Sequence, residues 1–161
     1  SQTLNGVGVA GTNFTSTIPQ SINLEFQSGV AENTLVFGSI RWQDWSEFDI
    51  TPVVSGSPLT LIDYQSDYIT YTLGVGRRFN ETWSGALTVA HEPATGDVQG
   101  NLAPRDGYTS IGAGLTWRHG STEVTGGLRH VWLGDATTQT VGASFTDNEA
   151  TAVGLRITQR F

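Results

Sequence analysis

The chain has 161 residues and a net charge of −7, and its composition excludes several classes of protein. Cysteine is absent, which excludes disulfides, thiolate metal sites and thiol nucleophiles. The acidic balance argues against a nucleic-acid partner, because phosphate binding requires clustered basic side chains.

Apolar residues recur at every second position along most of the sequence, which is typical of strands with one apolar face. The first predicted strand follows Pro19 and places Ile22 and Leu24 on its apolar face. A second strand is predicted over residues 34–45, and a third over residues 68–79, after a long connection. The N-terminal half of the chain is therefore predicted to be β-structure.

Four further strands follow, and they are predicted over residues 83–90, 108–118, 123–132 and 151–161. Short turns are expected near residues 31–34, 80–82 and 119–121, and long loops near 48–67, 92–107 and 133–145. This alternation is typical of up-and-down outer-membrane barrels, whose strands average to a neutral hydropathy. The sequence predicts an all-β fold, an antiparallel up-and-down transmembrane β-barrel with about seven strands here. Because an odd number of strands does not close such a barrel, several preceding strands are expected outside this sequence.

Large aromatic residues on the apolar face lie near the strand ends, where a membrane-interface girdle would place them. The residues expected in this girdle are Trp42, Trp83, Trp117 and Trp132, with the C-terminal Phe161 at the short-turn end. The alternative is that these side chains are ordinary core aromatics.

Three arginines, Arg41, Arg129 and Arg156, fall on the polar face of their strands. A guanidinium pairs well with a carboxylate, so these residues are candidates for binding the head of an amphiphilic acid. The alternative is that they form ion pairs with Glu25 or Glu123 on neighbouring strands.

The first long loop carries a group of apolar residues that would suit an exposed capture groove for a hydrophobic ligand. These residues are Leu59, Leu61, Ile62 and Tyr64. Packing of the loop on itself explains the same pattern.

Enzymatic function is not expected from this sequence. The histidines His91, His119 and His130 fall at different strand ends, so they form neither a catalytic triad nor a metal-ligand spacing. We therefore expect no catalytic residue, no metal and no cofactor.

Several segments together resemble the C-terminal half of the FadL-like outer-membrane transporters of long-chain fatty acids and hydrocarbons. They are residues 18–22, 35–48, 71–79, 80–85 and 154–161, and the Trp-x-x-Trp-Ser-x-Phe run over residues 42–48 is the most specific. The resemblance implies a monomeric barrel of about 14 strands in the bacterial outer membrane, plugged by an N-terminal hatch. Residues 1–161 would then supply the last seven strands, without the hatch or the first strands.

The resemblance also implies passive transport of hydrophobic compounds such as long-chain fatty acids or aromatic hydrocarbons. The implied partners are the hydrophobic ligand, membrane lipids and lipopolysaccharide, and the barrel-assembly machinery, which would bind the C-terminal strand. One alternative is a structural or adhesive outer-membrane barrel without a transported ligand. A third reading is a soluble lipid-binding barrel, in which Ile40, Leu87 and Leu155 would be buried inside.

Overall fold

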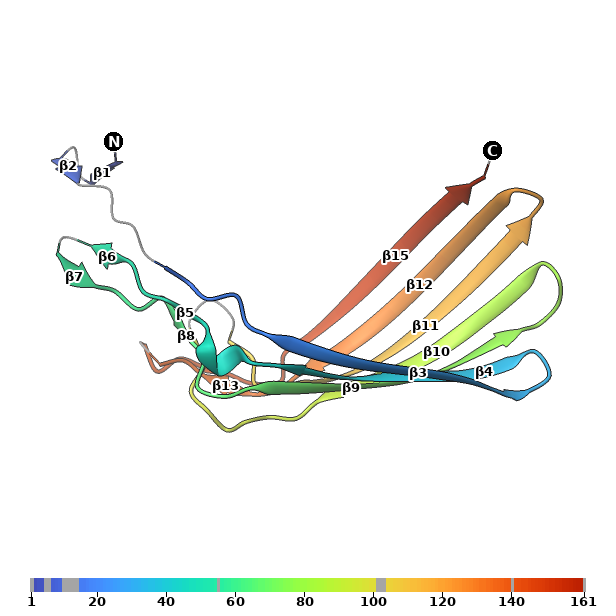
Figure 1. Cartoon of the computed structure of the whole chain (residues 1–161), viewed down its shortest axis with the longest axis horizontal. Helices are drawn as coiled ribbons and strands as arrows, with labels where there is room; N and C mark the ends of the chain where they lie inside the picture. The colour runs from blue at the N-terminus through green and yellow to red at the C-terminus, as the bar shows by residue number, and fades with distance from the viewer. Residues whose placement is uncertain are drawn as a thin grey trace.

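The chain forms a single large antiparallel β-sheet with almost no helix (Figure 1). The computed structural model describes residues 2–4, 7–9, 15–54, 56–100, 104–139 and 141–160. The seven long strands are β3 (Ser21–Ala31), β4 (Thr34–Gln43), β9 (Tyr68–Arg78), β10 (Trp83–Glu92), β11 (Tyr108–His119), β12 (Thr122–Leu133) and β15 (Glu149–Gln159). Their order in the sheet is β15-β12-β11-β10-β9-β4-β3, so each strand pairs with the next long strand in sequence. The predicted all-β, antiparallel, up-and-down arrangement of seven strands is confirmed.

Shorter elements lie in the long loops and at the N-terminal end. They are β1 (Gln2–Leu4) with β2 (Val7–Val9), β5 (Asp49–Ile50) with β8 (Ile62–Asp63), β6 (Val53–Val54) with β7 (Ser57–Pro58), β13 (Ala136–Thr137) with β14 (Ser144–Phe145), and the 3₁₀ turn η1 (Trp45–Glu47). The sequence pattern does not predict these strands, because two or three residues are too few for a visible alternation. None of the described residues lies in a helix long and apolar enough to cross a lipid bilayer.

The short turns all lie at one end of the sheet, and the long loops lie at the other (Figure 1). Asn33 turns the chain between β3 and β4 with a φ of 57°, which asparagine tolerates better than most residues. Between β9 and β10, the Asn80 Oδ1 accepts hydrogen bonds from the amides of Thr82 and Trp83, at 2.9 and 2.8 Å. These local bonds close the turns and set the register of the strands that follow.

Phenylalanine rings cover glycines on the neighbouring strand at two places. Phe26 is the register partner of Gly38, and Phe37 is the register partner of Gly74. A Cβ atom on either glycine would collide with the facing ring. The missing side chains therefore let the rings lie flat on the sheet, a packing that stabilises glycine-containing strands.

The strand register separates an apolar face from a polar face. One cross-strand row of the apolar face is Val36, Val75, Leu87, Ala113, Leu128 and Val153. The corresponding row of the other face contains Gly74, Thr88, Gly112, Arg129 and Ala152. We call them the outer face and the inner face.

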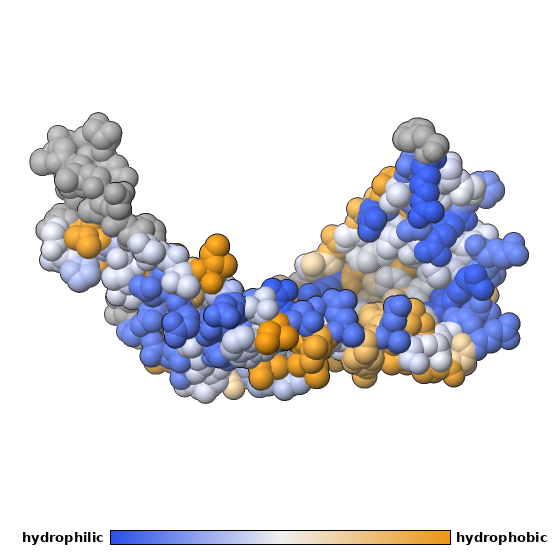
Figure 2. Space-filling view, viewed as in Figure 1, coloured by the Kyte–Doolittle hydropathy of each residue, from blue (hydrophilic) through white to orange (hydrophobic). Residues whose placement is uncertain are grey.

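The outer face is exposed along its whole width. Ile40, Leu87 and Leu155 are 44%, 57% and 72% exposed in this open sheet, whereas a soluble lipid-binding barrel would bury them inside. Figure 2 shows hydrophobic residues gathered along the underside of the sheet in this view. Among the described residues, the only buried hydrophobic ones are Ala90 and Ala136, so the sheet is held by its hydrogen-bond ladder rather than by a core.

The sheet is open, and β3 and β15 are its two edges. Antiparallel neighbours alternate in direction, so the first and seventh strands run the same way. Pairing β3 with β15 would therefore create a parallel pair.

Candidate functional site

A polar cluster lies at the long-loop end of the inner face, around Glu92. Glu92 is the last residue of β10 and is only 5% exposed. Its carboxylate accepts a hydrogen bond from Thr70 Oγ1 at 2.9 Å and forms an ion pair with Arg105 Nη1 at 2.7 Å. The ion pair joins the loop between β10 and β11 to the wall of the sheet.

Two arginines flank the ring of Tyr108, the first residue of β11. The guanidinium carbons of Arg105 and Arg129 lie 5.3 and 5.6 Å from the ring centroid, within cation–π range. Arg129 also donates from Nε and Nη2 to the buried Ser110 Oγ, at 3.1 and 2.9 Å. No acidic side chain of the described residues pairs with Arg129, so its charge faces the inner side of the sheet uncompensated.

Two long loops are bonded to each other above this cluster. The buried carboxylate of Asp106 accepts hydrogen bonds from the amides of Thr95 and Gly96, each at 2.7 Å. Gly134 of the next long loop donates its amide to the carbonyl of Gly107 at 3.0 Å, and a Cβ at Gly134 would collide with the carbonyl of Asp106. The two loops therefore form one rigid rim, which requires glycine at the point of closest approach.

The second contact between these loops is made by Gln99. Its amide donates to the carbonyl of Thr137 at 2.8 Å, and its carbonyl accepts from the amide of Gln139 at 3.0 Å. The Gln99 side chain also accepts a hydrogen bond from Tyr68 Oη at 3.1 Å. Gln99 therefore connects both loops to the start of β9.

Aromatic side chains line the approach to Glu92 and Arg105. The ring centroids of Trp45 and Tyr64 are 5.1 Å apart, and those of Tyr64 and Tyr68 are 6.1 Å apart. A cavity of about 100 Å³ lies between this aromatic cluster and the ion pair, and it is lined by Gln43, Trp45, Tyr64, Tyr68, Glu92 and Arg105. This space suits a small polar head group, since one water molecule occupies about 30 Å³ of liquid.

Asp67 holds the aromatic turn η1 against the end of the sheet. Its carboxylate accepts hydrogen bonds from Trp42 Nε1 at 3.1 Å and from the Ser46 amide at 3.2 Å. Burial by itself would raise the pKa of Asp67, but the hydrogen bonds from Ser46 and Trp42 outweigh it and lower the pKa below its ordinary value of 3.8. The ionised carboxylate is therefore the form that supports this arrangement.

The three predicted arginines lie on the inner face, but they do not form one cluster. Arg41 pairs in register with Asn23 and Thr70 near the long-loop end, whereas Arg156 pairs with Thr125 towards the short-turn end. Arg129 lies between these levels on β12 and is joined to the polar cluster through Tyr108. The structure thus places only Arg129 beside the candidate site.

The ion pairs considered as alternatives for these arginines are not present among the described residues. Glu123 instead pairs with Arg118 at 2.7 Å. Glu25 accepts a hydrogen bond from Asn23 Nδ2 at 2.6 Å.

The first long loop pairs with itself as a two-part hairpin, and part of its apolar surface remains exposed. Ile62 pairs with Ile50, and Tyr64 joins the aromatic cluster. Leu59 and Leu61 are exposed and bind the rest of the hairpin through their amides. The backbone of this loop therefore packs on itself, while the side chains of two leucines remain exposed, and their role in ligand capture stays a prediction.

The predicted girdle tryptophans lie at the two ends of the outer face. Trp83 and Trp117 are register partners at the short-turn end. Trp42 and Trp132 lie at the long-loop end, where Trp132 packs edge-to-face on His130 at 4.5 Å. Phe161 lies outside the described residues.

Glu92, Tyr108 and Arg105 were not predicted as site residues. The signal for the first two was present, because Glu92 continues the inner-face alternation of β10 and Tyr108 begins that of β11. The ion pair of Arg105 with Glu92 depends on the path of the loop, which alternation does not describe.

Comparisons with models of known protein families and with curated proteins find no match to this chain. Across the described ranges, no group of three acidic or histidine side chains is placed to hold a metal ion. The arrangement places a small polar pocket next to an aromatic approach, while Arg129 lies outside the pocket lining and reaches the cluster through the ring of Tyr108.

Proposed function

We propose that this sheet is part of the wall of an outer-membrane β-barrel that carries hydrophobic compounds, such as long-chain fatty acids or aromatic hydrocarbons, into the cell envelope. The observation that carries the proposal is the outer face, which is apolar, exposed and bounded by tryptophans at both ends. Such a face is stable in contact with lipid, and tryptophan rings favour the interface between lipid and water.

The dimensions of the strands support this placement. Each of the seven long strands has 10 to 12 residues. At about 3.3 Å per residue and a tilt of about 40°, such strands span roughly 25–30 Å, which matches the apolar band of outer-membrane barrels.

The open edges of the sheet support a larger barrel. Because β3 and β15 run the same way, fully antiparallel closure requires an odd number of additional strands. Two identical sheets with their loops on the same side would not satisfy this rule, since each junction would again be parallel. Seven further strands satisfy it and give the roughly 14-stranded barrel that the sequence resemblance implies.

The inner face supports passage of an amphiphilic acid. Its central row consists of small residues, Gly76, Ala86, Gly114, Gly127 and Gly154, which leave room along the wall. Arg129 offers a cation on this face, beside the ring of Tyr108. A carboxylate entering there would gain a charge-assisted hydrogen bond.

The second candidate function is a structural barrel without a transported ligand. The bonds of Gly134 and Gln99 between the long loops favour it, because a rigid rim also serves to cover a barrel. The two candidates differ in whether anything crosses the membrane.

Uptake by vesicles tests the proposal. The full-length protein is reconstituted into phosphatidylcholine vesicles, and the entry of oleate and of toluene is measured against protein-free vesicles. We expect both compounds to enter faster, with Arg129→Gln slowing oleate by about tenfold, because a hydrogen bond to a charged group contributes about 1.5–3 kcal/mol. Toluene should be unaffected, and Arg78→Gln, which removes a turn contact to Asn33, should change neither.

Equal uptake by protein-containing and protein-free vesicles would overturn the transport proposal and favour the structural barrel. An equal slowing of oleate and toluene by Arg129→Gln would instead assign Arg129 a structural role.

A further inference from the structure

The outer face is hollowed near the short-turn end, at a row of small residues. Gly85 is the register partner of Arg77 on one side and of Leu115 on the other, and Leu115 pairs next with Gly126. Both glycines lack a side chain, and Leu87 and Leu128 flank the small Ala113 in the next row. The result is a groove of about 690 Å³, which lies within the range of about 300–1,000 Å³ usual for ligand pockets.

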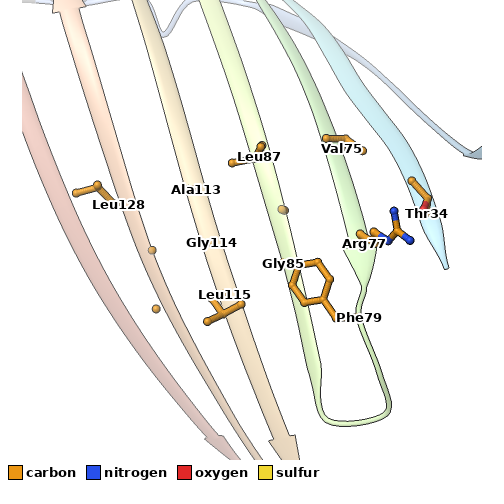
Figure 3. A pocket seen from close by; sticks show the side chains of 13 residues that line it. Thr34, Val75, Arg77, Phe79, Gly85, Leu87, Ala113, Gly114, Leu115 and Leu128 are labelled. Carbon is orange, nitrogen blue, oxygen red and sulfur yellow. The ribbon is translucent and has the colours of Figure 1, made fainter.

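The walls of this groove are apolar, and Figure 3 shows how its side chains lie. Leu87, Leu115 and Leu128 stand around it on β10, β11 and β12. The ring of Phe79 lies over Gly85, where an added Cβ would be 3.1 Å from the ring. The groove therefore has the shape and chemistry that an extended hydrocarbon chain requires.

Arg77 is the single charged side chain among the residues that line the groove. It lies beside Thr34 at the edge of the apolar lining, one residue before the end of β9. No acidic side chain of the described residues pairs with it. Its neighbour Arg78 differs, because it points to the inner face and binds Asn33 Oδ1 through Nε and Nη2, at 3.0 and 2.7 Å.

We propose that this groove is a binding site for one anionic phospholipid of the surrounding bilayer, with an acyl chain in the groove and the phosphate at Arg77. The inference rests on the proposed function, since it requires the outer face to contact lipid. Arg77 lies near the end of β9, at the depth where a lipid head group is expected. Arginines near the end of a membrane-spanning strand extend towards the lipid–water interface. Charge complementarity selects an anionic lipid over a zwitterionic one.

Tryptophan quenching by brominated lipid tests the site in the full-length protein. Trp83 lies two residues from Gly85 on the same strand and face, about 7 Å along the chain. It serves as the reporter when the other four tryptophans of this sequence, and any in the rest of the full-length protein, are replaced by phenylalanine. The protein is reconstituted into phosphatidylcholine vesicles that contain a minor fraction of either brominated phosphatidylglycerol or brominated phosphatidylcholine.

We expect brominated phosphatidylglycerol to quench Trp83 more strongly than brominated phosphatidylcholine at the same mole fraction. Arg77→Gln should reduce this preference about fivefold, as expected for one basic residue near a membrane surface. Arg78→Gln should leave the preference unchanged, because that side chain is bound to Asn33 on the other face.

A second pair of variants separates filling of the groove from a change in charge. Gly126→Leu should abolish the preference, because the new side chain enters the groove and meets nothing within 4 Å of its Cβ. Gly154→Leu is the matched control: its Cβ is equally unobstructed, but it lies on the inner face of the adjacent strand. Circular dichroism of each variant checks that the sheet is formed.

Three outcomes would overturn the site. Equal quenching by both lipids would mean an ordinary lipid-facing wall, with the membrane placement intact. Displacement of brominated phosphatidylglycerol by an equal mole fraction of oleate would identify the occupant as a free fatty acid. Absence of quenching by either lipid would mean that the outer face does not contact lipid. The proposed function would then be wrong as well.

Discussion

The outer and inner faces of the sheet share one backbone but differ in what their side chains contact. Outer-face residues such as Leu73 and Leu87 touch neighbours within the sheet and are otherwise exposed. Inner-face residues at the loop end, such as Glu92 and Ser110, are buried and bonded to side chains from other strands and loops. The comparison shows that hydrogen bonds to other strands and loops fix the polar side chains at the loop end of the inner face. The apolar side chains of the outer face contact only their neighbours in the sheet and leave a large surface exposed.

The largest expected effect comes from placing a charge on the outer face. On the proposed membrane placement, Leu87→Arg should destabilise the full-length protein in lipid vesicles by about 2–4 kcal/mol, because the charge would lie near the middle of the apolar band. Thr88→Arg, one residue along on the inner face, should cost much less. Urea unfolding in vesicles measures both. Equal losses of stability in the two variants would contradict the assignment of the outer face to lipid and of the inner face to water.

A smaller effect is expected from breaking the loop-end ion pair. Glu92→Gln should destabilise the loop rim by about 1–2 kcal/mol, because the carboxylate is buried while its partner Arg105 is partly exposed to water. Hydrogen exchange of the amides of residues 104–107 measures the loosening. Glu149→Gln is the control, since Glu149 is largely exposed beside His130. Unchanged protection in Glu92→Gln would mean that the backbone bonds alone hold the rim.

The smallest effect concerns the pH dependence of the aromatic turn at Asp67. Because hydrogen bonds lower the pKa of Asp67 below 3.8 in the folded chain, its contribution is fully present above that value and is lost as the pH falls through the lowered pKa. Fluorescence of Trp42 and Trp45 should therefore be constant from neutral pH to about pH 4 and change below it. Asp67→Asn should remove that change. A transition near neutral pH in the parent would exclude Asp67 as its source.

The strands were predictable because their signal is local. Alternation along ten residues specifies both a strand and the face that each side chain takes, so β9 and β11 begin at the predicted Tyr68 and Tyr108. The turns carry local signals as well, and Asn33 and Asn80 close them with their own side chains. The positions of the tryptophans at the strand ends follow from the same counting.

The candidate site was only partly predictable, because its residues meet through space. Arg129 was placed on the correct face by alternation, but its contact with Tyr108 follows from the register of β11 and β12. The alternation also suggested ion pairs with Glu123, which the sheet instead pairs with Arg118 across the turn. The register between two neighbouring strands decides which side chains become partners, and the sequence of one strand alone does not encode that register.

By itself, the sequence determined the seven strands, their up-and-down order and the division into an apolar and a polar face, since each depends on residues close together in the chain. The tertiary structure alone decided the polar rim around Glu92, Asp106 and Gln99 and the groove beside Arg77. The rim depends on how separate loops fold over one end of the sheet. The groove depends on glycines from different strands reaching the same level, and only the strand register sets that alignment.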